Sequence, residues 1–170
     1  GRGRAMSDRT TFTDAEWTLL RVAPSFVSVG VAAADPSGLF ASIHEALAGA
    51  RAATESLNAK RDVALFSALA ADTSVPKLPD IDALLGAGPE EVRMQNFKDV
   101  ALQRIRASIE LLQRKAAPNE LDAYRQLLLR VAADAANAAK EGGFLGIGGV
   151  RVSAKERAFI DQVRAAAGIE

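Results

Sequence analysis

The segment Trp17–Asp35 constrains the fold more than any other part of the chain. It reads WTLLRVAPSFVSVGVAAAD and has no charged residue within Val22–Ala34. A helix on the surface of a globular protein shows one apolar stripe and one polar face. This segment is apolar or small on all sides, which predicts a helix that other elements cover completely. We expect Phe26 and Val29 to lie in the core that this helix organises.

Length and composition favour a single helical domain. The chain has 170 residues, which is the size of one ordinary domain, and 49% of them are hydrophobic. Alanine is heavily used and has the highest intrinsic helix propensity. We therefore predict an all-α, single-domain bundle of five to six helices over residues 6–170, with the N-terminal helix buried at its centre. Gly1–Ala5 precede Met6 and are interpreted as a non-native extension.

Capping patterns predict where two of the helices begin. Thr13 and Glu16 have the spacing of a capping box, and Phe12 and Trp17 have the spacing of a hydrophobic staple. Ser153 and Glu156 form a second capping box at the start of a final helix. Pro24 lies inside the first helical pattern and predicts a kink near Leu20–Pro24.

Proline, glycine and periodicity divide the middle of the chain. A single helix over 38–71 would be about 50 Å long, longer than the expected globule, so we predict a break near Asn58. Residues 72–88 read as an irregular crossover with one short helical segment between Asp80 and Gly86. A long helix follows Pro89, and Asn119 is predicted to cap the next one.

Charge and cysteine content argue against several functional classes. Lys and Arg total 21, as do Asp and Glu, so the chain lacks the basic excess of a nucleic-acid-binding protein. It has no cysteine, which fits a cytoplasmic protein. The first residues are acidic, unlike a secretory leader. The uncharged run spans 13 residues, whereas crossing a bilayer takes about 20.

Three side chains on predicted helices are candidate ligand-binding residues. Arg21 lies among apolar residues and needs a carboxylate or carbonyl partner, so it forms a structural ion pair or lines a cavity; we favour the ion pair. His44 is the only histidine, and Tyr124 lies on the inner stripe of its helix. One histidine cannot supply a helical di-iron site, and no zinc or calcium motif is present. We predict no metal site, cofactor or catalytic motif.

The glycine-rich stretch at 142–149 allows two interpretations. Its candidate anion-binding residues are Gly146, Gly148, Gly149 and Arg151, next to the start of the last helix, whose N-terminus carries partial positive charge. Neither a Walker loop nor a dinucleotide fingerprint fits the spacing. Phe144, Leu145 and Ile147 are apolar, and we expect a packed turn that closes one end of the bundle.

The closing segment GGVRVSAKERAFIDQVRAAAG resembles the last helix of small bacterial helical domains of the tellurite-resistance (TerB-like) type. Val152, Ser153 and Glu156 match the helix start of that family. Gly149 and Val150 replace the family's Asp-Gly turn, so the metal-binding role that the resemblance would imply is not carried over. The resemblance implies an all-helical bacterial domain.

The sequence predicts a non-enzymatic helical-bundle interaction module that acts through a protein partner or self-association. The alternative is a protein that binds an apolar or anionic small molecule between helices, near Arg21 and the kink. A pocket of several hundred Å³ lined by Arg21, His44 or Tyr124 would favour the alternative.

Overall fold

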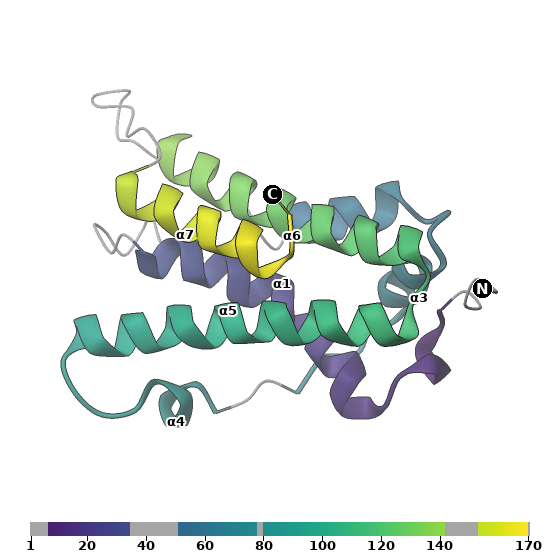
Figure 1. The fold of residues 1–170 in the computed structure, drawn as a ribbon, viewed down its shortest axis with the longest axis horizontal. Coiled ribbons are helices and arrows are strands. Elements are labelled where there is room, and N and C mark those ends of the chain that lie inside the picture. The colour runs from purple at the N-terminus through teal and green to yellow at the C-terminus, as the bar shows by residue number, and fades with distance from the viewer. Residues whose placement is uncertain (1–6, 35–50, 78–79, 142–152, 170) are drawn as a thin grey trace.

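A computed structural model describes residues 7–34, 51–77, 80–141 and 153–169. All regular structure in these ranges is helical, so the all-α prediction is confirmed (Figure 1). The elements are η1 (Arg9–Thr11), α1 (Asp14–Ala34), a helix whose described part covers 51–59, α3 (Ala64–Ala71), α4 (Ile81–Leu85), α5 (Glu90–Lys115), α6 (Pro118–Glu141) and α7 (Ala154–Ala166).

Both predicted capping boxes form. At α1, the Thr13 N–H donates to Glu16 Oε1 at 2.9 Å, and the Glu16 N–H donates to Thr13 Oγ1 at 3.2 Å. The ring centroids of Phe12 and Trp17 lie 5.9 Å apart, which completes the staple. Ser153 and Glu156 make the same reciprocal pair at α7. These local bonds fix where each helix begins.

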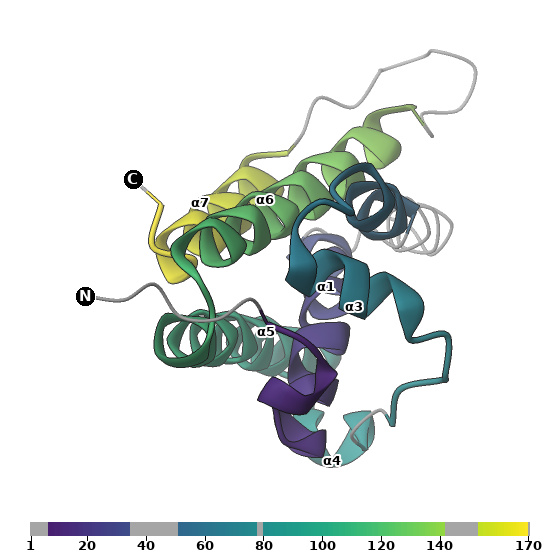
Figure 2. The ribbon, with the colours of Figure 1, turned by 90° about the vertical axis from the view of Figure 1, so that its right-hand side faces the viewer.

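Helix α1 lies at the centre of the bundle, between α5 on one side and α6 and α7 on the other (Figures 1 and 2). Phe26 is buried, as predicted. The prediction that α1 is covered on all sides is wrong for one strip, because Val29 is 39% exposed and Ser25 is exposed. These two residues are four apart and share a face that α5, α6 and α7 leave uncovered.

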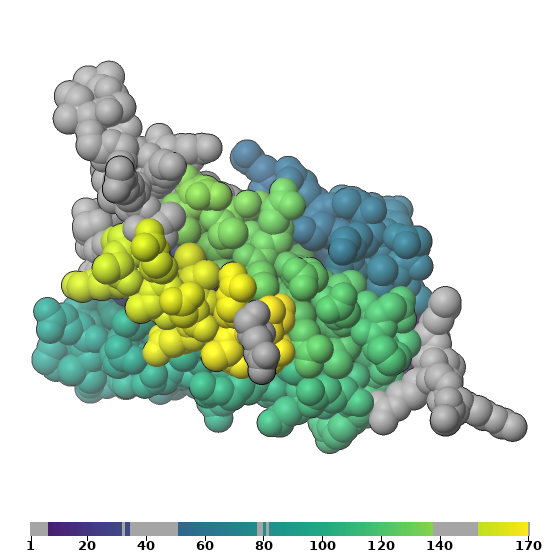
Figure 3. All heavy atoms as spheres, turned by 45° about the horizontal axis from the view of Figure 1, so that its top comes forward, coloured from purple at the N-terminus to yellow at the C-terminus, as the bar shows by residue number. Residues whose placement is uncertain are grey.

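The two longest helices, α5 and α6, run antiparallel and enclose α1 from different sides. Only Ala116 and Ala117 connect α5 to α6, so the two helices run in opposite directions. Helix α7 lies beside α6 and also contacts α5 (Figure 3). Where α7 meets α1, the Phe159 ring lies on Gly30, and a Cβ at that glycine would be 2.5 Å from Phe159 Cζ. The absence of a side chain at Gly30 therefore permits this close approach.

The predicted break after residue 58 is present. The helix that includes 51–59 ends in a turn over 60–62, and α3 begins at Ala64. The crossover contains the predicted short helix α4. The Asp80 side chain accepts a hydrogen bond from the Ala83 N–H at 3.2 Å, and Gly86 ends the helix with a φ of 72°. Asp80 therefore serves as a helix cap.

Candidate functional site

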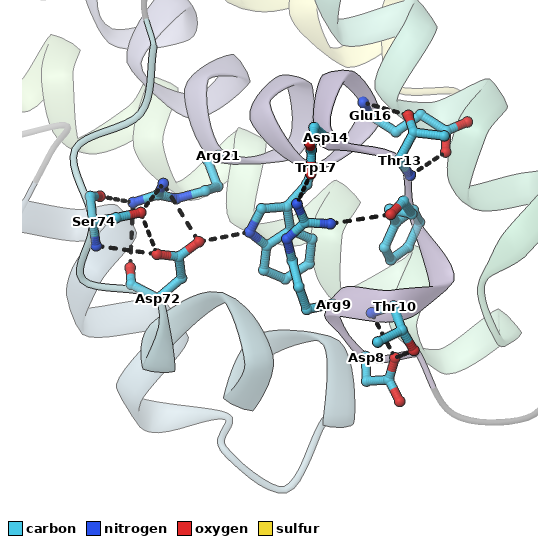
Figure 4. Close-up of polar contacts among 11 residues, drawn as sticks. Asp8, Arg9, Thr10, Thr13, Asp14, Glu16, Trp17, Arg21, Asp72 and Ser74 are labelled. Carbon is cyan, nitrogen blue, oxygen red and sulfur yellow. Dashed lines mark hydrogen bonds and ion pairs between the residues drawn. The ribbon is translucent and has the colours of Figure 1, made fainter.

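The N-terminal half of α1 presents Trp17 and Arg21 to the segment that follows α3 (Figure 4). The two residues are one helical turn apart, so their side chains share a face. Trp17 Nε1 donates to Asp72 Oδ2 at 2.8 Å. Ser74 donates to Asp72 Oδ1 through its N–H at 3.0 Å and its hydroxyl at 2.5 Å. Asp72 therefore joins α1 to the crossover segment.

The guanidinium of Arg21 is held by several oxygens of this segment. Its Nη1 lies 3.5 Å from Asp72 Oδ2 and donates to Ser74 Oγ at 3.1 Å. Its Nη2 donates to the carbonyl of Asp72 at 3.2 Å and also to the carbonyl of Ser74. The Arg21 side chain is 14% exposed. The predicted structural ion pair is thus present, and it neutralises a largely buried charge.

The same contacts lower the pKa of the Asp72 carboxyl group. The Ser74 hydroxyl has the largest effect, followed by the Trp17 indole and the Ser74 N–H, and the Arg21 charge adds a smaller one. Together they lower this pKa to about 2. Hydrogen bonds to a carboxylate favour its ionised form, so Asp72 is negatively charged near neutral pH.

Pro24 lies inside α1, three residues after Arg21, and the helix continues through it. Proline has no N–H, so the carbonyl of Leu20 lacks its usual partner within the helix. The Tyr124 hydroxyl, which comes from α6, donates to this carbonyl at 2.8 Å. Burial raises the pKa of Tyr124 above its ordinary range, with a smaller opposing effect from Ser108. Tyr124 therefore remains a neutral hydrogen-bond donor that compensates for the proline.

A hollow of about 360 Å³ opens beside Arg21 and Pro24, between α1, the helix at 51–59, α3 and α6. Its apolar lining comes from all four helices, and its polar lining comes from α1, from the helix at 51–59 and from Asp72. The lining residues are Leu20, Arg21, Pro24, Ser25, Ala53, Thr54, Leu57, Asn58, Leu69, Ala70, Asp72 and Leu127. We call this the Arg21 hollow.

The structure brings together only some of the predicted binding residues. Arg21 lines the hollow, whereas Tyr124 is 0% exposed and lies behind Leu20, where its hydroxyl is already bonded. His44 lies outside the described residues. The glycine-rich stretch with Gly146, Gly148, Gly149 and Arg151 does too, so its two interpretations stay predictions.

Sequence reasoning missed Glu120, which is 1% exposed and lies at the start of α6. Its carboxylate accepts from Ser7 N and Oγ at 3.2 and 2.9 Å, from Leu65 N at 2.8 Å, and from Ala117 N at 3.0 Å. It thereby caps both α3 and α6. The predicted cap at Asn119 is wrong, because α6 already begins at Pro118 and Glu120 bonds the backbone ahead of it.

Acidic residues of the described ranges do not gather into a metal site. No group of three or more His, Cys, Asp or Glu side chains in these ranges could hold a metal ion. Asp82, an acidic residue of the crossover, pairs with Arg93 at 2.9 Å. None of the helices described here is long and apolar enough to cross a bilayer.

Comparison with known proteins gives no relative: no family model, curated protein or solved structure matches the chain. The resemblance of the C-terminal segment to TerB-like domains therefore stays a prediction.

Proposed function

We propose that this protein is a non-enzymatic module that binds a small, uncharged and largely apolar molecule in the Arg21 hollow. The observation that carries the proposal is the hollow itself. Its volume of about 360 Å³ falls within the range of small-molecule sites, about 300–1,000 Å³. Such sites combine mostly apolar walls with a few polar groups that orient the ligand.

The charge of the hollow favours a neutral ligand. Arg21 is paired with Asp72, and its two terminal nitrogens also donate to carbonyl and hydroxyl oxygens. An acidic ligand would have to displace Asp72, which is held by Ser74 and Trp17 as well. A neutral ligand whose apolar body lies against Leu57 does not have to displace Asp72, so the bonds of Asp72 stay intact.

The test is equilibrium binding of N-phenyl-1-naphthylamine, a neutral fluorescent probe, to the intact chain. Ser25 is exposed and lines the hollow, so Ser25→Phe should obstruct it without disturbing the core. Ser67 on α3 is also exposed and does not line the hollow, which makes Ser67→Phe the matched control. We expect the probe to bind the parent and the control, and to bind Ser25→Phe at least tenfold more weakly. Equal binding to both variants would contradict the proposal.

The exposed Val29 favours a second candidate function, self-association. Val29 and Ala33 of α1 form an apolar hollow of about 220 Å³ with Leu85, Met94 and Phe97. An exposed apolar surface of this kind is typical of contact sites. Native mass spectrometry should then detect a dimer whose fraction rises with concentration and falls in Val29→Glu. A monomer at every concentration would remove this candidate.

A further inference from the structure

A second hollow lies on a neighbouring face of α1, between α1, α5 and the segment that follows α3. Its volume is about 480 Å³. Ala15, Leu19 and Val22 supply apolar surface from α1, where their spacing of three and four residues puts them on one face. Lys77 and Arg104 complete the lining from the crossover segment and from α5. We call this the Arg104 hollow.

Its two cations have no carboxylate partner within the ranges that the structure describes. Among the described residues, neither Lys77 nor Arg104 forms an ion pair. The Arg104 guanidinium carbon lies 5.6 Å from the centroid of the Phe26 ring, so the cation is oriented by an aromatic face and keeps its hydrogen-bond donors free of carboxylates. This is the opposite of Arg21, whose charge Asp72 compensates.

Asp14 is the one acidic residue in the lining, and its charge is already paired. Its carboxylate binds Arg9, and its side chain is 97% exposed, so it points into solvent. The Arg104 hollow therefore combines apolar surface with two positive charges for which residues 7–34, 51–77, 80–141 and 153–169 supply no counterion.

We propose that the Arg104 hollow binds a free amphiphilic anion, a small molecule with one acid group on an apolar body. The apolar body would cover Ala15 and Leu19, and the acid group would bind Lys77 and Arg104. A guanidinium presents paired donors that match the geometry of carboxylate, sulfonate or phosphate oxygens. This site is separate from the Arg21 hollow, and it takes the class of ligand that the paired charge of Arg21 disfavours.

Two probes that differ only by an acid group test the proposal. These are 1-anilinonaphthalene-8-sulfonate and its uncharged counterpart, N-phenyl-1-naphthylamine, each titrated into the intact chain. We expect the sulfonate to bind at a single site in the Arg104 hollow. Arg104→Gln and Lys77→Gln should each lower the affinity for the sulfonate about three- to fivefold, which is the range for exposed charge pairs. Neither variant should change the affinity for the neutral probe. Arg104→Lys keeps the positive charge without the paired donors, so its affinity should lie between that of the parent and that of Arg104→Gln.

Controls separate this site from general charge effects and from the first hollow. Arg114 is an exposed arginine on α5 and is absent from the lining, so Arg114→Gln removes the same charge elsewhere. It should not change binding, and neither should Ser25→Phe. A loss in Arg114→Gln equal to that in Arg104→Gln would overturn the proposal. The proposal would also be overturned if the protein bound phosphatidylglycerol vesicles and did not bind the soluble sulfonate.

Discussion

Glu120 allows the sharpest test of how this bundle is held together. Glu120→Gln keeps the shape of the side chain and replaces one carboxylate oxygen with an amide nitrogen. With the amide oxygen in the position of Oε1, the bonds to that oxygen from Ser7 and Ala117 persist. The Leu65 N–H faces another donor in place of Oε2, and the Ser7 N–H loses the second of its two acceptors. The substitution therefore leaves one buried donor, the Leu65 N–H, without an acceptor, and the remaining bonds lose their charge assistance.

The magnitude follows from those bonds. A buried donor without an acceptor costs about 1–3 kcal/mol, and each of three charge-assisted bonds weakens by about 1 kcal/mol when the acceptor becomes neutral. The lower desolvation cost of an amide offsets part of this sum. We expect Glu120→Gln to lower the free energy of unfolding by about 3–5 kcal/mol. This is a large part of the total, because the free energy of unfolding of a typical domain is about 5–15 kcal/mol.

Urea denaturation followed by circular dichroism measures this change. The control is Glu110→Gln on the exposed face of α5, which makes the same chemical replacement and should stay within about 0.5 kcal/mol of the parent. If the two variants unfold at the same urea concentration, Glu120 does not cap α3 and α6 in the way described, and the reasoning fails.

Three further outcomes are expected. Tyr124→Phe should cost about 1–3 kcal/mol in denaturant titration, because the Leu20 carbonyl then has no partner; an unchanged midpoint would contradict this. Gly30→Ala should destabilise by about 1–3 kcal/mol through overpacking against Phe159, and Phe159→Leu should relieve part of it in the double variant. The lowered pKa of Asp72 stabilises the fold above the ordinary carboxyl value of 3.8, and this contribution is lost as pH falls towards about 2. Thermal unfolding of Asp72→Asn should therefore depend less on pH between about 4 and 2 than that of the parent.

Features that depend on neighbours in the sequence could be predicted from it. The capping boxes at Thr13 and Ser153 need only residues three apart, so the pattern itself contains both partners. The same holds for the break after residue 58 and for the short helix capped by Asp80. In each case the deciding interaction lies within one turn of the chain.

Features that depend on residues far apart in the chain could not be predicted from the sequence. The donors of Glu120 lie 113 and 55 positions away, at Ser7 and Leu65, and no local pattern connects them. Arg21 could be identified as needing a partner, yet Asp72 is 51 positions along the chain. Val29 is exposed because the surrounding helices leave one strip of α1 uncovered, which hydrophobicity alone does not indicate.

The place of α1 in the chain also affects how the protein is made. Helix α1 precedes in the chain the three helices that cover it, α5, α6 and α7, so it is synthesised before them. Between Ala34 and Ala166 the ribosome must add 132 residues (166 − 34). At about 5–20 residues per second this takes roughly 7–26 s, and during this time the apolar sides of α1 gain α5, then α6 and finally α7 as partners. Transiently exposed apolar surface favours aggregation, so we expect the side of α1 that still lacks a partner to be a site of chaperone binding until α7 has been made.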